Sequence, residues 1–211
     1  RYNLCPDVVF LSCPPTDGTL CDFLAIRADS VHRMPEGMSF EQGAMAEPVA
    51  VAVHAVNRAR MRNGAGAVIL GCGPIGLLTL QVFKAAGGGH ALCVDPVPER
   101  RALAEELGAD EVCEPARIAD WSGTAEVVFE TAGADSATFR AFEIARPGGT
   151  VVQVGWPGSN VLPLDVGMFL AKELDYVSVN RYANAFPTAI AWLADGRVKT
   201  EKIITHRFEL G

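Results

Sequence analysis

A glycine-rich turn in the first half of the chain constrains the fold more than any other feature of the sequence. Residues 71–76 read Gly-Cys-Gly-Pro-Ile-Gly, which fits the pattern G-x-G-x-x-G. A short apolar run, residues 67–70, precedes the turn, and a helix-like apolar stretch, residues 75–86, follows it. A buried strand, a tight turn and a helix in this order are typical of the first unit of a doubly wound α/β sheet.

Each glycine of this turn has a physical reason to be there, and together they predict a dinucleotide site. Gly71 permits the tight turn, Gly73 lets backbone N–H groups approach a pyrophosphate, and Gly76 lets the helix pack on the strand. The positive end of the helix then faces the phosphates. We therefore expect residues 71 and 73–76 to bind the phosphates of a dinucleotide, through Gly71, Gly73, Pro74, Ile75 and Gly76.

An acidic residue after the next apolar run predicts which dinucleotide is bound. Asp95 follows residues 91–94 and lies 19 positions after Gly76. A carboxylate there accepts hydrogen bonds from ribose hydroxyls and repels a 2′-phosphate, which favours NAD over NADP. Arg100 and Arg101 weaken this preference, since an arginine can hold a 2′-phosphate. We expect Arg100 to lie beside the adenine. A methyltransferase and a flavin enzyme remain minor alternatives for this pattern.

The rest of the chain repeats the alternation of short apolar strands and helices of about ten residues. We predict further strands over residues 111–113, 126–130, 150–154 and 175–179, with helices over 99–107 and 136–145. Strands that are apolar throughout are buried on both faces, which requires a parallel sheet with helices on each side. The predicted fold is therefore α/β, a Rossmann-type doubly wound parallel sheet.

The two ends of the chain follow different patterns. Residues 1–40 are rich in proline and glycine between short apolar runs, and we predict irregular β structure there. Ser39 is a candidate N-cap for a helical stretch over residues 40–62, which we expect to break at Pro48. An amphipathic helix is predicted over residues 187–193, and residues 202–210 are predicted as one more strand.

Composition excludes several classes of protein. The net charge of −7 disfavours binding to nucleic acid through bulk electrostatics. Residues 65–83 carry no charge over 19 positions, but Gly and Pro in the middle argue against a membrane span. The six cysteines form no C-x2-C pair, which favours reduced thiols and a cytoplasmic protein. The chain opens at Arg1 without a Met or a signal sequence, so we expect either a fragment or a processed product of a longer protein.

Motifs along the whole chain resemble those of one enzyme family. They are Arg1-Tyr2-Asn3-Leu4-Cys5-Pro6, Pro14-Pro15-Thr16-Asp17-Gly18-Thr19-Leu20-Cys21, Met34-Pro35-Glu36-Gly37-Met38-Ser39-Phe40-Glu41-Gln42-Gly43-Ala44, Glu47-Pro48, the glycine turn, Gly108-Ala109-Asp110, Arg146-Pro147-Gly148-Gly149, Arg181-Tyr182 and Thr205-His206-Arg207-Phe208. On these residues the chain resembles the zinc-dependent medium-chain dehydrogenases, and within them the polyol group that includes sorbitol and xylitol dehydrogenases.

The resemblance implies how the chain divides into domains. Residues 1–40 and 182–211 are expected to be remnants of a GroES-like catalytic β domain, and residues 41–181 the complete NAD-binding domain. In the family, the Cys, His and Glu that hold the catalytic zinc precede the position of Arg1, so the main zinc ligands are expected upstream. Cys5 matches a ligand of a structural zinc in the wider family, but we expect a free thiol there.

The resemblance also implies roles for residues outside the glycine turn. Glu47 is the one candidate metal ligand, and it lies in an otherwise apolar helical stretch, where a charge is costly unless it is paired or used. Arg181 and Tyr182 are expected to contact the substrate hydroxyls, and Arg181 also the nicotinamide half of NAD. The remaining candidates for cofactor binding follow the fourth, fifth and sixth strands: Thr131, Gly133, Val154, Gly155, Trp156, Val179 and Asn180.

The function that this resemblance implies is oxidation of a polyol at a secondary alcohol, with hydride transfer to NAD and assistance from zinc. The expected partners are a small polyol and further copies of the same chain, and neither nucleic acid nor a membrane. Alternatives remain open: an NAD-binding module without activity, a zinc-free quinone reductase, or another alcohol or threonine dehydrogenase of the superfamily.

Overall fold

The structure is a computed structural model and describes residues 2–209. Its centre is a six-stranded sheet in the order β3-β2-β1-β4-β5-β6, in which every pair of neighbouring strands is parallel. This is the doubly wound order with its reversal between β1 and β4, so the predicted Rossmann-type fold is confirmed. The strands are β1 (Ala67–Leu70), β2 (Ala91–Val94), β3 (Glu111–Cys113), β4 (Ala125–Glu130), β5 (Ala145–Gln153) and β6 (Asp175–Ser178).

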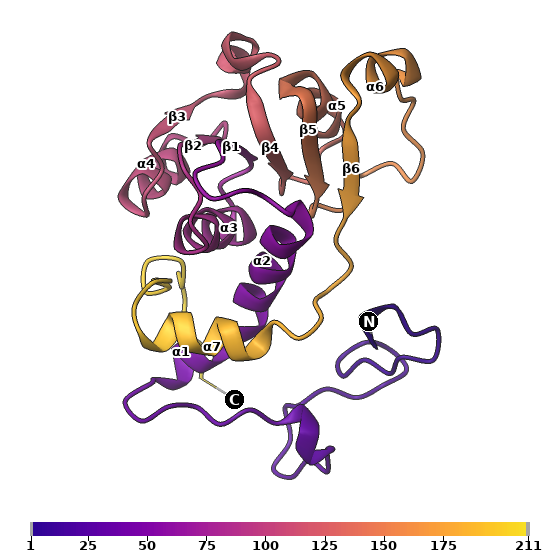
Figure 1. Cartoon of the computed structure of the whole chain (residues 1–211). Coiled ribbons are helices and arrows are strands. Elements are labelled where there is room, and N and C mark those ends of the chain that lie inside the picture. Colours follow the sequence, from indigo (N-terminus) through magenta and orange to yellow (C-terminus); the bar gives the residue numbers. More distant parts are fainter. Residues whose placement is uncertain (1, 210–211) are drawn as a thin grey trace.

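Helices cover both faces of the sheet, because alternate side chains of each strand point to opposite faces. Ile69 and Phe129 pack on one face with α2 (Ala46–Ala59), α3 (Pro74–Ala85) and α7 (Phe186–Ala194). Val68 and Val128 pack on the other face with α5 (Asp135–Ile144) and α6 (Val166–Lys172). Figure 1 shows these layers, with the short α1 (Phe40–Ala44) beneath α7. Along the chain, α4 (Pro98–Glu106) follows β2 and leads to β3.

The apolar stretch over residues 65–83 is accounted for within this core. It forms β1, the glycine turn and most of α3. Across the described part of the chain, we find no helix with the length and apolar character that crossing a membrane would require.

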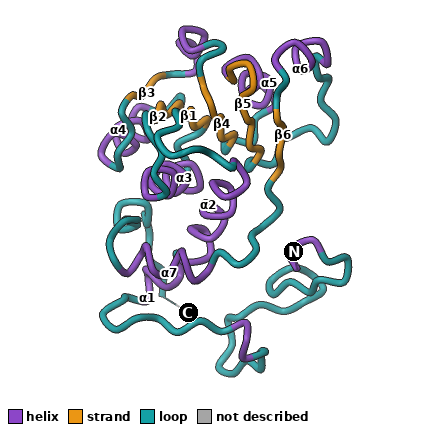
Figure 2. The backbone as a smooth tube through the Cα atoms, viewed as in Figure 1, coloured by secondary structure: helices purple, strands orange, loops and turns teal. Residues whose placement is uncertain are grey.

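The N-terminal segment, defined here as residues 2–39, does not form the predicted β structure. Among the described residues it contains only turns and two short 3-10 helices, Tyr2–Leu4 and Ala28–Ser30. Figure 2 shows it as a long loop that runs outside the sheet and its helices. The prediction was wrong because an extended apolar run becomes a strand only when a neighbouring strand completes its hydrogen bonds.

Two further predictions at the ends of the chain need correction. The helical stretch breaks at Met45 rather than at Pro48, since Pro48 lies in the first turn of α2, where no intrahelical N–H bond is lost. Over residues 202–209 there is a turn followed by irregular chain and no strand, and residue 210 lies outside the described residues. Ser39 is confirmed as the N-cap of α1, where it forms a capping box with Gln42.

Candidate functional site

The glycine turn has the geometry that its sequence predicts. Gly71 has a φ of +97°, and a Cβ on it would lie 2.9 Å from the backbone of Ala132. A Cβ on Gly76 would lie 1.8 Å from the Gly71 carbonyl oxygen. At Gly73, by contrast, a Cβ would meet nothing within 4 Å. Two glycines are thus required by packing, while the third faces open space at the N-terminus of α3.

Asp95 joins the glycine turn to the end of β2. Asp95 is only 3% exposed. Its Oδ2 accepts a hydrogen bond from the Cys72 N–H at 2.8 Å, and its Oδ1 accepts one from the Val97 N–H at 2.8 Å. The Arg100 guanidinium lies 3.8 Å from Oδ2. Each carboxylate oxygen keeps a second lone pair for a further donor. Arg101 does not share this site, because it donates to the backbone carbonyls of Asp95 and Pro96.

A cleft of about 460 Å³ opens between the glycine turn and α5. Five predicted site residues line it, namely Gly71, Gly73, Asp95, Arg100 and Thr131. Ala132, which the sequence analysis expects to pack near the dinucleotide with Thr131 and Gly133, also lines it. The lining residues that the sequence analysis did not select are Leu70, Val94, Pro96, Pro115, Ile118, Ala134, Ser136, Ala137 and Arg140. The four in the segment after β4, Ala134, Ser136, Ala137 and Arg140, could have been found by noting that this segment adjoins the β1 turn once the strand order reverses.

Thr131 and Glu130 hold the end of β4 against the glycine turn. The Thr131 hydroxyl contacts the carbonyl oxygens of Leu70 at 2.8 Å and Gly71 at 2.9 Å. The Glu130 carboxylate is fully buried and accepts the N–H groups of Ala132 at 2.8 Å and Gly133 at 2.9 Å. It also accepts a hydrogen bond from the Gln153 side chain. Burial raises the pKa of Glu130, and these three donors oppose the rise.

The sequence analysis placed Glu130 only in a strand and assigned it no role. An acid that directly follows three apolar strand residues, Val127–Phe129, was the available signal, since a buried carboxylate needs several donors. Here the donors come from the turn after β4 and from β5, so Glu130 fixes the loop at the carboxyl edge of the sheet.

The residues predicted for the nicotinamide half gather at the same edge, after β5 and β6, but they do not line the cleft. A Cβ on Gly155 would lie 2.4 Å from the Gly133 nitrogen, and a Cβ on Gly133 would lie 2.7 Å from the Trp156 carbonyl oxygen. The Trp156 residue is 78% exposed. Val154 donates its N–H to the Glu130 carbonyl oxygen, and Val179 donates to Gln153. The structure places these backbones side by side, and their role in binding stays a prediction.

Glu47 and Tyr182 come together from distant parts of the sequence. Glu47 is in the first turn of α2 and Tyr182 follows β6, and the Tyr182 hydroxyl lies near enough to the Glu47 carboxylate for each group to affect the pKa of the other. Glu47 lies at the surface, yet loss of hydration to its neighbours raises its pKa. Desolvation and the nearby carboxylate raise the pKa of Tyr182 to about 12. The Glu47 carboxylate is thus open to water on one side and has the Tyr182 hydroxyl as a polar neighbour on the other.

Arg181 lies beside Tyr182 but points to a different partner. Its guanidinium carbon lies 3.1 Å from the centroid of the Phe10 ring, in the N-terminal segment. The preceding residue, Asn180, accepts a hydrogen bond on its carbonyl oxygen from the Asn3 side chain at 2.9 Å.

The described residues do not make a metal site by themselves. Within residues 2–209, no three side chains of His, Cys, Asp or Glu come together in a set that could hold an ion. A catalytic zinc takes three protein ligands. Glu47 offers one carboxylate, and Cys5 is an exposed free thiol.

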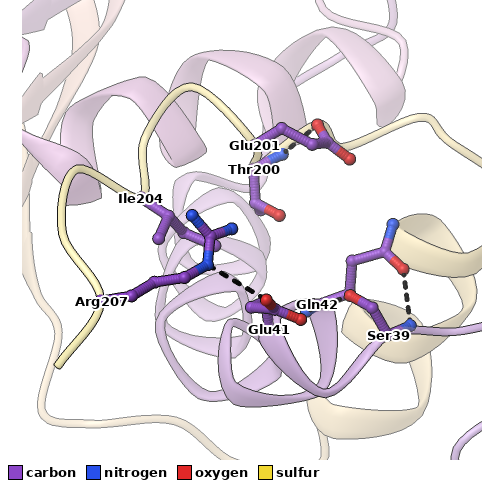
Figure 3. A pocket seen from close by; sticks show the side chains of 7 residues that line it. All are labelled: Ser39, Glu41, Gln42, Thr200, Glu201, Ile204 and Arg207. Atoms are coloured by element: carbon purple, nitrogen blue, oxygen red, sulfur yellow. Dashed lines mark hydrogen bonds and ion pairs between the residues drawn. The ribbon is translucent and has the colours of Figure 1, made fainter. Parts of the chain in front are cut away.

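A second cavity, of about 310 Å³, lies between the start of α1 and residues 200–207 near the end of the chain. Figure 3 shows its lining, in which Arg207 reaches across to Glu41 at 3.2 Å. None of the predicted site residues lines it, so it is separate from the cleft beside the glycine turn.

Comparison with known proteins agrees with this geometry. The family described as zinc-binding dehydrogenase matches residues 74–195. The sorbitol dehydrogenase of Bacillus subtilis (strain 168) is 36% identical over 219 residues, which cover 100% of this chain and 62% of that protein. The chain therefore spans about three-fifths of the length of this relative.

Two solved structures share the fold and carry a nicotinamide cofactor. A short chain alcohol dehydrogenase from Escherichia coli CFT073, complexed with NADH, superposes with a TM-score of 0.90 at 26% identity, covering 98% of this chain and 63% of that one. A structure from Sinorhizobium meliloti 1021, bound to NADP, has a TM-score of 0.88 at 26% identity and covers 95% and 61%.

Proposed function

The chain belongs to the zinc-binding dehydrogenase family, and from this we propose that it is the cofactor-binding part of an NAD-dependent polyol dehydrogenase. The reaction would oxidise a secondary alcohol of a polyol to a ketone, with NAD accepting the hydride at its nicotinamide ring. The observation that carries the proposal is the glycine turn with Asp95, set on a cleft that is large enough for part of a dinucleotide.

In this proposal the chain's own residues bind and orient the cofactor. The N–H groups at the start of α3 would hold the pyrophosphate, since the space beside Gly73 is open and helix N-termini attract anions. The free lone pairs of Asp95 would accept the ribose hydroxyls. Because Cys72 also donates to Asp95, the same carboxylate would keep the phosphate turn and the ribose site in register.

The preference for NAD over NADP rests on charge at the ribose. A 2′-phosphate would approach the buried Asp95 carboxylate, and the repulsion is weakly screened there. The Arg100 guanidinium lies 3.8 Å from the same carboxylate, so its positive charge already offsets part of the negative charge of Asp95.

The substrate would lie near Glu47, Arg181 and Tyr182, at the carboxyl edge of the sheet, where open α/β folds bind ligands. Zinc supplies Lewis-acid chemistry in this family. Because the described residues offer only Glu47, we propose that the main ligands come from residues upstream of Arg1 and derive no step through the metal. The matching division is residues 1–40 and 182–211 in the catalytic domain and 41–181 in the cofactor domain.

We further propose that the protein is a cytoplasmic homo-oligomer that binds neither nucleic acid nor a membrane. The edge strand β6 supports the assembly, because it pairs with β5 alone and leaves Tyr176 43% exposed. Sedimentation of the protein as its gene encodes it tests this point, and a monomer at micromolar concentration would exclude it.

Calorimetric titration tests cofactor binding in this chain. We expect NAD to bind at least about tenfold more tightly than NADP, a difference of ~1.4 kcal/mol. Asp95→Ser should erase that preference, whereas Asp120→Ser, at an exposed acid in the segment before β4, should keep it. Equal binding of both cofactors by the unchanged protein would overturn the assignment of Asp95.

Turnover tests the enzymatic part of the proposal. The protein as its gene encodes it, supplied with zinc, should reduce NAD in the presence of sorbitol or xylitol. Binding of NAD without turnover of any polyol would favour an NAD-binding module, and a requirement for NADPH and a quinone would favour the zinc-free reductase.

A further inference from the structure

The loop after β6 is hydrogen-bonded to residues near the N-terminus of the chain. This loop, residues 180–185, carries the proposed substrate residues Arg181 and Tyr182. The Asn3 side chain donates to the Asn180 carbonyl oxygen at 2.9 Å, and the Asn184 N–H donates to the Tyr2 hydroxyl oxygen at 2.8 Å. Figure 1 shows the N-terminus near the chain that leaves β6.

A third contact engages the arginine itself. The Arg181 guanidinium carbon lies 3.1 Å from the centroid of the Phe10 ring, within the range of a cation–π contact. Both side chains are half-buried. Among residues 2–209 no carboxylate forms an ion pair with Arg181, so the Phe10 ring is the contact that fixes the position of this charge.

The backbone of the loop shows why it needs outside contacts. Arg181 has a φ of +61° and Asn184 a φ of +54°, both in the left-handed region that non-glycine residues enter at a cost. Such conformations persist only where the surroundings hold them. Here Tyr2, Asn3 and Phe10 contact the loop from the N-terminal segment, and Tyr182 packs beside Phe186 of α7.

We propose that Phe10 is a positioning residue for Arg181: its ring fixes the guanidinium at the place where it meets the polyol. This inference rests on the proposed function, since it takes Arg181 as a substrate contact. The N-terminal segment thereby sets the substrate site from outside the cofactor domain, although it contributes nothing to the cleft that holds the cofactor.

Steady-state kinetics on the protein as its gene encodes it test the proposal. Phe10→Leu keeps an apolar side chain but removes the ring, and we expect the KM for the polyol to rise about 5- to 20-fold. The kcat should change less than about threefold, and the dissociation constant of NADH, measured by fluorescence, should stay within about twofold. Phe23→Leu is the matched control, because Phe23 is in the same segment and is 93% exposed.

Two further variants separate positioning from packing. Phe10→Trp offers Arg181 a ring that binds a cation more strongly, so the KM for the polyol should stay within about threefold. If Phe10 acted only by packing, the larger side chain should instead raise that KM. In the double variant Phe10→Leu with Arg181→Met, the KM should equal that of Arg181→Met alone, because Phe10 acts through the arginine.

Several outcomes would overturn the proposal. They are an unchanged KM in Phe10→Leu, multiplication of the two effects in the double variant, or an equal loss in Phe10→Trp. If Phe10→Leu does not fold, the comparison of Phe10→Trp with the unchanged protein decides. An unchanged protein without turnover would instead count against the proposed function.

Discussion

The six-stranded sheet and the N-terminal segment contain similar apolar side chains, but only the sheet buries them. In the sheet, Ile69 and Phe129 are completely buried, while in the N-terminal segment Leu20 and Phe23 are 87% and 93% exposed. The sheet repeats one geometry, so that each strand gives its neighbour both backbone partners and an apolar face. The N-terminal segment lacks that repetition among the described residues. Apolar composition alone therefore does not produce a core.

The largest contrast should appear when a phenylalanine is truncated in each region. Phe129→Ala removes a fully buried ring of β4 that packs edge-on against Phe83 of α3, and it should lower the free energy of unfolding by about 3–5 kcal/mol. Phe23→Ala should change it by less than about 0.5 kcal/mol. Urea unfolding followed by circular dichroism measures both, and similar losses would show that the N-terminal segment contributes a core of its own.

Two glycines of the same turn sharpen the comparison within the cofactor domain. In Gly76→Ala the new Cβ meets the Gly71 carbonyl oxygen, so we expect a loss of about 3 kcal/mol or more together with loss of NAD binding. Gly73→Ala is the control: its methyl group enters open space, so the melting temperature should hold while NAD binding weakens. The assignment of the pyrophosphate site fails if Gly73→Ala binds NAD normally.

The buried Glu130 should make the free energy of unfolding depend on pH, and an exposed acid of the N-terminal segment should not. Its pKa is raised above the usual 4.5 of the unfolded chain, so its contribution to stability is fully present below that value and is lost as pH rises through the raised pKa. Glu130→Gln also turns an amide toward the Gln153 amide and should cost about 1–3 kcal/mol.

The gap in unfolding free energy between the unchanged protein and Glu130→Gln should therefore narrow between pH 4 and pH 7. Glu36→Gln, at an exposed position of the N-terminal segment, is the control and should follow the unchanged protein. A gap that widens with pH would contradict the proposed effect of burial on Glu130.

The smallest effect concerns a helix end. The Lys172 ammonium donates to the carbonyl oxygens of Phe142, Glu143 and Ala145 at 2.8–3.0 Å and so closes the C-terminus of α5. Lys172→Met should cost about 1 kcal/mol. Lys202→Met removes only an exposed pair with Glu106 and should cost less than about 0.5 kcal/mol. Equal melting temperatures for the two variants would show that Lys172 contributes no more than a surface charge.

Much of the cofactor domain could be predicted because its signals are local. The turn at residues 71–76 needs glycine at Gly71, where the backbone is left-handed, and at Gly76, where a side chain would clash. Both positions belong to one six-residue motif, so the sequence alone identifies them. Asp95 could be identified because the strand before it is apolar throughout. The rule that crossovers between parallel strands are right-handed then constrains how each strand joins the next.

The sequence by itself thus determined the parallel sheet, the glycine turn and its acid, because periodicity and turn chemistry act over a few neighbouring residues. Only the tertiary structure decided which distant groups meet: Glu130 with Gln153, Glu47 with Tyr182, and Phe10 with Arg181. These pairs join segments whose separation along the chain carries no repeating signal. A hydrogen bond or a ring contact depends on where folding brings two side chains, and no local pattern records that position.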